Sequence, residues 1–128
     1  MIRVVRLGTP RQAGEGLRLG TVRRPPRGVP KREYGTRDFY DVWVPELAPS
    51  AKLFSSIKSR PLTDANWRTF SRRYVAEMKR PEARRLIGLL AALSSGTNLS
   101  VGCYCENETR CHRSLLKRLL RQAGAVVA

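Results

Sequence analysis

All three cysteines and the only histidine of the chain lie within ten consecutive residues, as Cys103, Cys105, Cys111 and His112. Thiols and imidazoles bind metal ions, form disulfides, attack electrophiles and carry protons. The same side chains also occur as buried residues without any reaction. Four interpretations of this cluster are therefore open: a zinc site, a redox pair, a catalytic thiolate, and a purely structural set.

A zinc site would take Cys103, Cys105, Cys111 and His112 as a complete set of three sulfurs and one nitrogen. The spacing argues against this set. In a regular strand Cys103 and Cys105 share a face, but their Cα atoms stand about 7 Å apart. The neighbours Cys111 and His112 diverge by about 100° if both lie on a helix. The sequence therefore assigns no metal and indicates no other cofactor.

Two further interpretations involve no catalysis. A redox pair would join Cys111 to Cys103 or Cys105, and needs Cα atoms closer than about 7 Å. In the structural interpretation the cysteines are small buried hydrophobes, and His112 is a buried ring that bonds the loop backbone. His112 lies on the apolar side of its predicted helix, which favours burial of the imidazole.

A catalytic centre would use Cys103 or Cys111 as a thiolate at a helix N-terminus, with His112 transferring the proton. Arg110 and Arg113 flank these residues and would lower the pKa of the thiol. The spacing from Cys105 to these arginines does not match the loop of thiolate phosphatases, in which five residues separate cysteine and arginine. The sequence therefore indicates no particular reaction.

The cluster also occupies a position typical of ligand sites. Residues 99–105 are predicted as a strand and residues 110–122 as a helix, so the loop between them lies at the carboxyl end of a strand and the amino end of a helix. Open α/β sheets bind ligands at this corner, and a helix offers free N–H groups to anions there. We expect phosphate contacts from five basic residues: Arg23, Arg24, Arg27, Arg113 and Lys117.

The composition favours a polyanionic partner. The chain of 128 residues carries 25 Lys and Arg against 10 Asp and Glu, a net charge of +15. Such a charge favours nucleic acid or a phosphate-bearing small molecule as the ligand, although a general enrichment in arginine at solvated positions is the plainer alternative. The odd, clustered cysteines exclude a secreted disulfide framework and indicate a cytoplasmic protein. The longest apolar run, 86–93, is too short for a membrane span, so no membrane partner is expected.

Strand and loop signals divide the amino-terminal half. Residues 2–7 and 40–44 are predicted as core strands, because both are rich in β-branched or aromatic residues. Residues 8–38 form a basic region rich in glycine, proline and arginine, with a brief extended piece at 17–23. We interpret this region as a binding loop. Asp41 is interpreted as exposed or paired with an arginine.

Helical signals dominate the second half. Ser50 is predicted to cap a helix that ends near residue 58, with Leu53, Phe54 and Ile57 facing inward, and Thr63 or Asp64 caps the next helix. That helix carries a stripe of Trp67, Phe70, Tyr74 and Met78, interpreted as core rather than as a platform for bases. A third helix begins at Pro81 and carries Leu86, Ile87, Leu90 and Leu93. Together these elements predict a single α/β domain over residues 1–128, three-layered, with a small and mostly parallel sheet flanked by helices.

The chain resembles an uncharacterised prokaryotic family, domain-of-unknown-function family 488. The resemblance rests on Pro26-Arg27-Gly28-Val29, on the segment 40–50, on the helix with Trp67, Phe70 and Tyr74, and on Cys103 followed eight positions later by Cys111-His112-Arg113. It implies a small α/β protein and supplies no reaction. The family typically carries an acidic residue where this chain has Cys105, which weakens a role for the Cys103–Cys105 pair.

Overall fold

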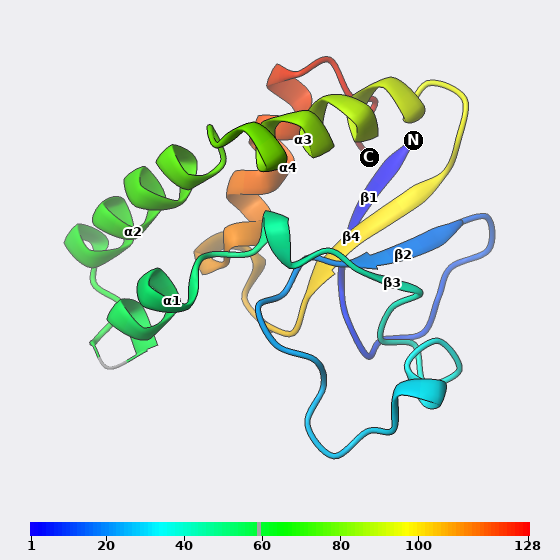
Figure 1. The fold of residues 1–128 in the computed structure, drawn as a ribbon, viewed down its shortest axis with the longest axis horizontal. Helices are drawn as coiled ribbons and strands as arrows, with labels where there is room; N and C mark the ends of the chain where they lie inside the picture. The colour runs from blue at the N-terminus through cyan, green and yellow to red at the C-terminus, as the bar shows by residue number, and fades with distance from the viewer. Residues whose placement is uncertain (59) are drawn as a thin grey trace.

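The computed structural model describes residues 1–58 and 60–128 and has an α/β fold built on a parallel sheet. Its strands follow the spatial order β1-β4-β2-β3 (Figure 1). The central strand β4 pairs with β1 on one side and β2 on the other, so that Val101 lies between Val4 and Leu19. All five residues of β4 are buried. Since the strands run parallel, their carboxyl ends share one edge of the sheet. The strands are β1 (Ile2–Arg6), β2 (Leu17–Gly20), β3 (Val42–Trp43) and β4 (Leu99–Cys103).

Within the described residues, four α-helices cover one face of the sheet (Figure 1) and supply most of the hydrophobic core. They are α1 (Ala51–Lys58), α2 (Asp64–Glu77), α3 (Pro81–Leu93) and α4 (His112–Gln122). The predicted start signals are confirmed: the Ser50 hydroxyl accepts a bond from the Leu53 N–H, and the Thr63 hydroxyl accepts one from the Asn66 N–H. Of the predicted inner residues of α1, Leu53 is buried but Phe54 is exposed, because this two-turn helix presents only a narrow face to α2.

The second face of the sheet is covered by the chain around residues 34–41 rather than by an α-helix. Tyr40 and Leu7 lie in a second apolar cluster there. Strand glycines make room for them. A Cβ at Gly20 would stand 2.3 Å from the Tyr40 ring, and one at Gly102 would stand 2.6 Å from Leu7. The three layers are therefore helices, sheet and this irregular segment, which leads into β3 in Figure 1.

The basic region 8–38 is more structured than the sequence predicts. It contains strand β2 and the short 3₁₀ helix η1 (Lys31–Glu33). Arg18 and Glu15 form a fully buried ion pair, with 1% and 2% of their surfaces exposed. Arg11 binds both carboxylate oxygens of Asp41 at 2.7 and 3.0 Å, which confirms the interpretation of Asp41 as an arginine partner. Several arginines of this region thus hold the fold together.

The prediction of a core strand over residues 40–44 is wrong. Only Val42–Trp43 forms a strand, at the edge of the sheet, and these residues are 45% and 43% exposed. The composition of an edge strand resembles that of a core strand, since both favour aromatic and β-branched residues. The neighbouring Tyr40 is buried instead, because it packs on the second face of the sheet before the strand begins.

Two predicted boundaries also shift at the corner between β4 and α4. The strand ends at Cys103 rather than at residue 105, and α4 begins at His112 rather than at residue 110. The chain between them includes the 3₁₀ helix η3 (Glu108–Arg110), capped by the Asn107 side chain. Among the described residues, no helix is both long and apolar enough to span a membrane.

Candidate functional site

Cys103, Cys105, Cys111 and His112 converge at the carboxyl end of β4, and we refer to them as the Cys–His cluster. The sulfurs of Cys103 and Cys105 are 3.6 Å apart. The Cys111 sulfur lies 3.7 Å from Nδ1 of His112. The ligand atoms of Cys103, Cys111 and His112 all fall within 4.8 Å of one another. All three cysteines are free thiols.

Regular strand and helix geometry would keep these side chains apart. That expectation fails for two local reasons. Strand β4 ends at Cys103, so the chain turns before Cys105 and brings the second sulfur back toward the first. Cys111 is the N-cap of α4 and has extended backbone angles, φ −121° and ψ 150°. The 100° divergence of successive helical residues therefore does not apply to Cys111 and His112. Regular strand and helix geometry was the wrong premise at this corner.

His112 is fully packed and held in one orientation. Its Nε2 lies 2.6 Å from the carbonyl oxygen of Thr21, so Nε2 carries the hydrogen and donates it. Burial lowers the pKa of His112 to about 4, which leaves the ring neutral at pH 7. The lone pair of the neutral ring is then on Nδ1, which faces the Cys111 sulfur. The prediction that this imidazole is buried and bonds loop backbone is confirmed.

The three thiols differ in exposure and in charge preference. Cys103 and Cys111 are buried, whereas Cys105 is exposed. Thiol hydrogen bonds from Cys103 and Cys111 hold the pKa of Cys105 well below its usual range. Thiol contacts with Cys105 and Cys111, together with burial, raise the pKa of Cys103. Cys105 is therefore the thiol of the cluster that loses its proton most readily.

Arg113 fixes the loop instead of facing solvent. Its guanidinium is buried, with 3% of the residue exposed, and Nη2 donates to the Cys105 carbonyl at 2.6 Å. Its Nε is buried and has no hydrogen-bond partner among the described residues. The phosphate contact predicted for Arg113 stays a prediction, but the first turn of α4 directs this side chain under the loop rather than toward solvent.

A cavity of about 230 Å³ lies directly against the Cys–His cluster. All four residues of the cluster contribute to its wall. An apolar part of the wall comes from the helices through Phe54, Ile57 and Phe70, and a basic part comes from Arg23, Arg24 and Arg110. The cavity thus combines an apolar surface, guanidinium groups and thiols in one place.

The five predicted phosphate ligands separate into two groups. Arg23 and Arg24 line the cavity, whereas Arg27, Arg113 and Lys117 do not. Arg27 is exposed in the turn after β2. The Nζ atom of Lys117 lies 3.9 Å from Oε1 of Glu108. Proximity to the cluster in sequence was therefore a poor guide to position around the cavity.

Two cavity residues were assigned other roles from the sequence. Phe70 was interpreted as core within the aromatic stripe of α2, yet it lines the cavity as well. Arg110 was considered only as a neighbour of a thiolate. It forms an ion pair with Asp64, and its guanidinium lies 5.9 Å from the centre of the Trp67 ring. The aromatic spacing of α2 was the available signal for Phe70 at the cavity and for Trp67 beneath Arg110.

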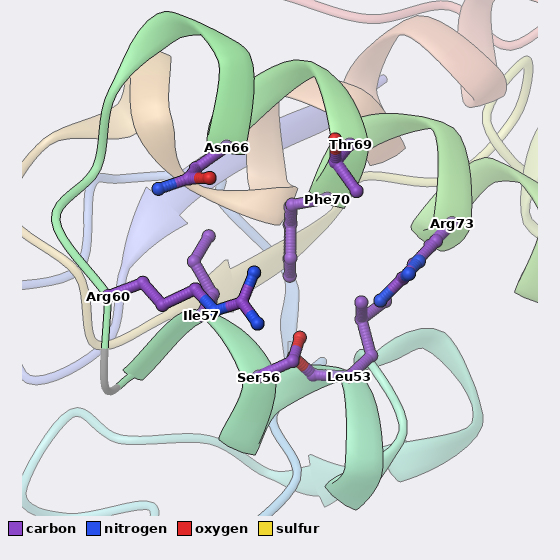
Figure 2. A pocket seen from close by; sticks show the side chains of 8 residues that line it. All are labelled: Leu53, Ser56, Ile57, Arg60, Asn66, Thr69, Phe70 and Arg73. Atoms are coloured by element: carbon purple, nitrogen blue, oxygen red, sulfur yellow. The ribbon is translucent and has the colours of Figure 1, made fainter.

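A second, smaller cavity of about 110 Å³ separates α1 from α2 (Figure 2). The side chains of Arg60 and Arg73 enter it from opposite ends, and Ser56 and Asn66 add polar atoms. Phe70 lies between the two cavities, since it lines both. This cavity contains no residue of the Cys–His cluster and no predicted phosphate ligand.

Comparison with known proteins gives one match. A family model described as the active DUF488-N3 subclade matches residues 2–124. No curated protein and no solved structure matches the chain significantly. The family match covers both the basic region and the Cys–His cluster.

Proposed function

The chain belongs to the DUF488 family, within its active DUF488-N3 subclade, and we propose that it binds a phosphate-bearing ligand, a nucleotide or a segment of nucleic acid, in the cavity beside β4. The observation that carries this proposal is the composition of the cavity wall. Apolar and aromatic side chains form one part, and three arginines form another. A nucleotide presents the same two chemistries, since its base is flat and apolar on its faces while its phosphate is anionic.

The apolar part of the wall suits a base. Phe54, Ile57 and Phe70 offer carbon surface, and Phe70 continues a stack with Trp67 at a centroid distance of 5.6 Å. Bases stack favourably on aromatic rings whatever their identity. A volume of about 230 Å³ is small for an entire drug-sized ligand, so the base would occupy the cavity and the phosphate would lie at its rim.

The arginines of the wall would play different roles. Arg23 donates to the carbonyl oxygens of Pro49 at 2.8 Å and Pro45 at 3.0 Å, and so shapes the wall. Arg24 is exposed and is the best placed to meet a phosphate. Guanidinium groups bind phosphate through paired, charge-assisted hydrogen bonds. The net charge of +15 would speed the approach of such ligands.

Binding of nucleoside monophosphates and of a short single-stranded oligonucleotide, measured by calorimetry at several salt concentrations, tests the proposal. Arg24→Ala is the informative variant and Arg27→Ala is its matched control, because both residues are exposed arginines and only Arg24 lines the cavity. We expect about a tenfold loss of affinity for Arg24→Ala, as for one phosphate contact, and a shallower salt dependence.

Equal losses in the two variants would indicate general electrostatic attraction to a basic surface and would contradict a site in the cavity. Absence of binding at low salt for every ligand would contradict the proposal as a whole. A further variant, Phe70→Leu, should weaken the binding of nucleotides more than that of inorganic phosphate, since only nucleotides carry a base.

A second candidate is a thiol-dependent reaction on the same ligand. The description of the subclade as active supports it, as does the position of the Cys105 thiol, which is exposed and lines the cavity. Mass analysis of a bound nucleotide after incubation tests this candidate. If Cys105→Ser still binds the nucleotide but no longer turns it over, the candidate is supported. If each single serine variant of the three cysteines turns the nucleotide over as fast as the unchanged chain, the candidate is contradicted.

A further inference from the structure

We propose that the Cys–His cluster is a tetrahedral zinc site whose ligands are the sulfurs of Cys103, Cys105 and Cys111 and Nδ1 of His112. This inference goes beyond ligand binding in the cavity and does not depend on it. It is an alternative to the thiol-dependent reaction, because a Cys105 thiolate bound to zinc is not a free nucleophile. Three thiolates and one imidazole are an established donor set for zinc.

The distances within the cluster match a tetrahedral site. With zinc–sulfur bonds of about 2.3 Å and zinc–nitrogen bonds of about 2.0 Å, two sulfurs stand about 3.8 Å apart, and a sulfur and a nitrogen about 3.5 Å apart. The Cys103 and Cys105 sulfurs are 3.6 Å apart, and the Cys111 sulfur is 3.7 Å from Nδ1 of His112. Each of these pairs has the separation of two ligands on one zinc ion. The ligand atoms of Cys103, Cys111 and His112 also lie within 4.8 Å of one another. Cys105 lies outside this group of three and joins it through its contact with the Cys103 sulfur.

The orientation of His112 is that of a metal ligand. Histidines that bind metals usually donate their second ring N–H to a carbonyl or carboxylate, which fixes the ring. Nε2 of His112 donates to the Thr21 carbonyl at 2.6 Å. The ring therefore directs the lone pair of Nδ1 toward the sulfurs.

The spacing of the ligands is unusual, but the local structure accounts for it. Common zinc sites place two to four residues between paired ligands, whereas one residue separates Cys103 from Cys105, and Cys111 and His112 are adjacent. The end of β4 lets the first pair converge, and the extended N-cap of α4 does the same for the second pair. Both deviations from regular geometry bring ligand atoms together.

The charge around the cluster also fits a zinc thiolate centre. Three thiolates with one Zn²⁺ carry a net charge of −1. The N-terminus of α4 faces this charge, and helix N-termini stabilise anions. The buried guanidinium of Arg113 bonds the Cys105 carbonyl. Among the described residues, no carboxylate forms an ion pair with it. A negative centre nearby would balance this buried cation.

Such a site would hold the loop between β4 and α4 in place. This loop carries Tyr104, Cys105 and Arg110, which all line the cavity. Zinc would therefore stabilise one wall of the cavity without having to touch the ligand bound there.

Metal analysis of the purified full-length chain tests this inference directly. We expect one zinc per chain by elemental analysis, retained during dialysis against a weak chelator. Replacement by Co²⁺ should give the absorption of a tetrahedral thiolate complex, with sulfur-to-cobalt charge-transfer bands. These bands report thiolate ligation whatever the function of the protein.

Variants identify the ligands. Cys105→Ser is the first choice, because Cys105 is exposed and its replacement leaves the core intact. Affinity for Zn²⁺, measured by competition with a chromophoric chelator, should fall by about 100-fold or more, since loss of an outer partner alone costs about 10- to 100-fold. The matched control is Tyr104→Phe, which changes the same loop without removing a ligand and should keep full affinity.

The inference is overturned by a chain that takes up no zinc from a chelator-buffered solution. It is also overturned if Cys105→Ser binds Zn²⁺ as tightly as the unchanged chain, or if the cobalt form lacks charge-transfer bands. Nucleotide binding to the unchanged chain and to Arg24→Ala, repeated after metal removal, separates failure of the zinc site from failure of the proposed ligand site.

Discussion

The two faces of the sheet are buried by different means. On the helix-covered face, apolar side chains such as Leu116 and Val101 pack in one large cluster. On the other face, the irregular segment is held by the buried pair of Arg18 and Glu15, by the pairing of Arg11 with Asp41, and by a smaller apolar cluster. A helix satisfies its own backbone, whereas an irregular segment must find partners for its polar groups. Charged side chains supply those partners here.

The network around Arg18 illustrates this requirement. Its guanidinium binds the Glu15 carboxylate and also donates to the carbonyl oxygens of Thr9, at 2.8 Å, and Asp38, at 2.7 Å. One side chain thereby connects three separate parts of the basic region. The difference between the faces shows that arginines in a basic segment can belong to the fold, and the following variants test that difference.

The largest effect is expected for Arg18→Met. The substitution leaves the Glu15 carboxylate buried without its partner, which typically costs about 3–5 kcal/mol. The free energy of unfolding in urea measures it. The double variant Glu15→Leu with Arg18→Met should recover part of the loss, because the buried charge is then gone. A loss below about 1 kcal/mol for the single variant would show that the pair is not buried.

The second largest loss in the free energy of unfolding is expected on the helix-covered face. Leu116→Ala removes a fully buried side chain, 0% exposed, and should reduce the free energy of unfolding by about 2–5 kcal/mol. Leu119→Ala on the same helix is the matched control, since Leu119 is only partly buried and should cost less. Equal losses at the two positions would contradict the arrangement of α4 against the sheet.

The smallest effect is expected for Asp41→Asn, and it depends on pH. The hydrogen bond from Arg11, with help from the Arg18 backbone N–H, lowers the pKa of Asp41 from its ordinary value of 3.8. A depressed pKa in the folded state stabilises the fold above pH about 4, and this contribution is lost as the pH falls further. The variant should therefore lose about 1 kcal/mol at pH 7, and progressively less as the pH falls below about 4 toward the lowered pKa of Asp41.

Unfolding of this variant, followed by circular dichroism between pH 3 and pH 7, measures the dependence. Asp64→Asn is the control, because Asp64 is an exposed partner of Arg110 and such surface pairs stabilise proteins little. The role given to the Asp41 carboxylate would be contradicted if the difference in unfolding free energy between Asp41→Asn and the unchanged chain stayed constant with pH.

Much of the fold could be predicted from local signals. The caps at Ser50 and Thr63, the proline at the start of α3 and the β-branched first strand all marked real elements, because such signals act over a few residues. The short edge strand β3 was mistaken for a core strand, since composition does not reveal which strand lies at the edge. The role of Arg18 was missed, because its partners come from distant parts of the basic region.

The candidate site divides in the same way. The sequence by itself determined that three thiols and an imidazole lie near a strand-to-helix corner in a basic α/β chain, because those facts follow from composition, spacing and local propensity. Only the tertiary structure decided that the donor atoms of Cys103, Cys111 and His112 lie within 4.8 Å of one another with the Cys105 sulfur beside that of Cys103. It also decided that Arg113 is buried, and that Arg24 rather than Arg27 lines the cavity. Convergence depends on where β4 ends and on how the Cys111 backbone enters α4. These details are set by packing between segments far apart in the chain, and local sequence does not specify them.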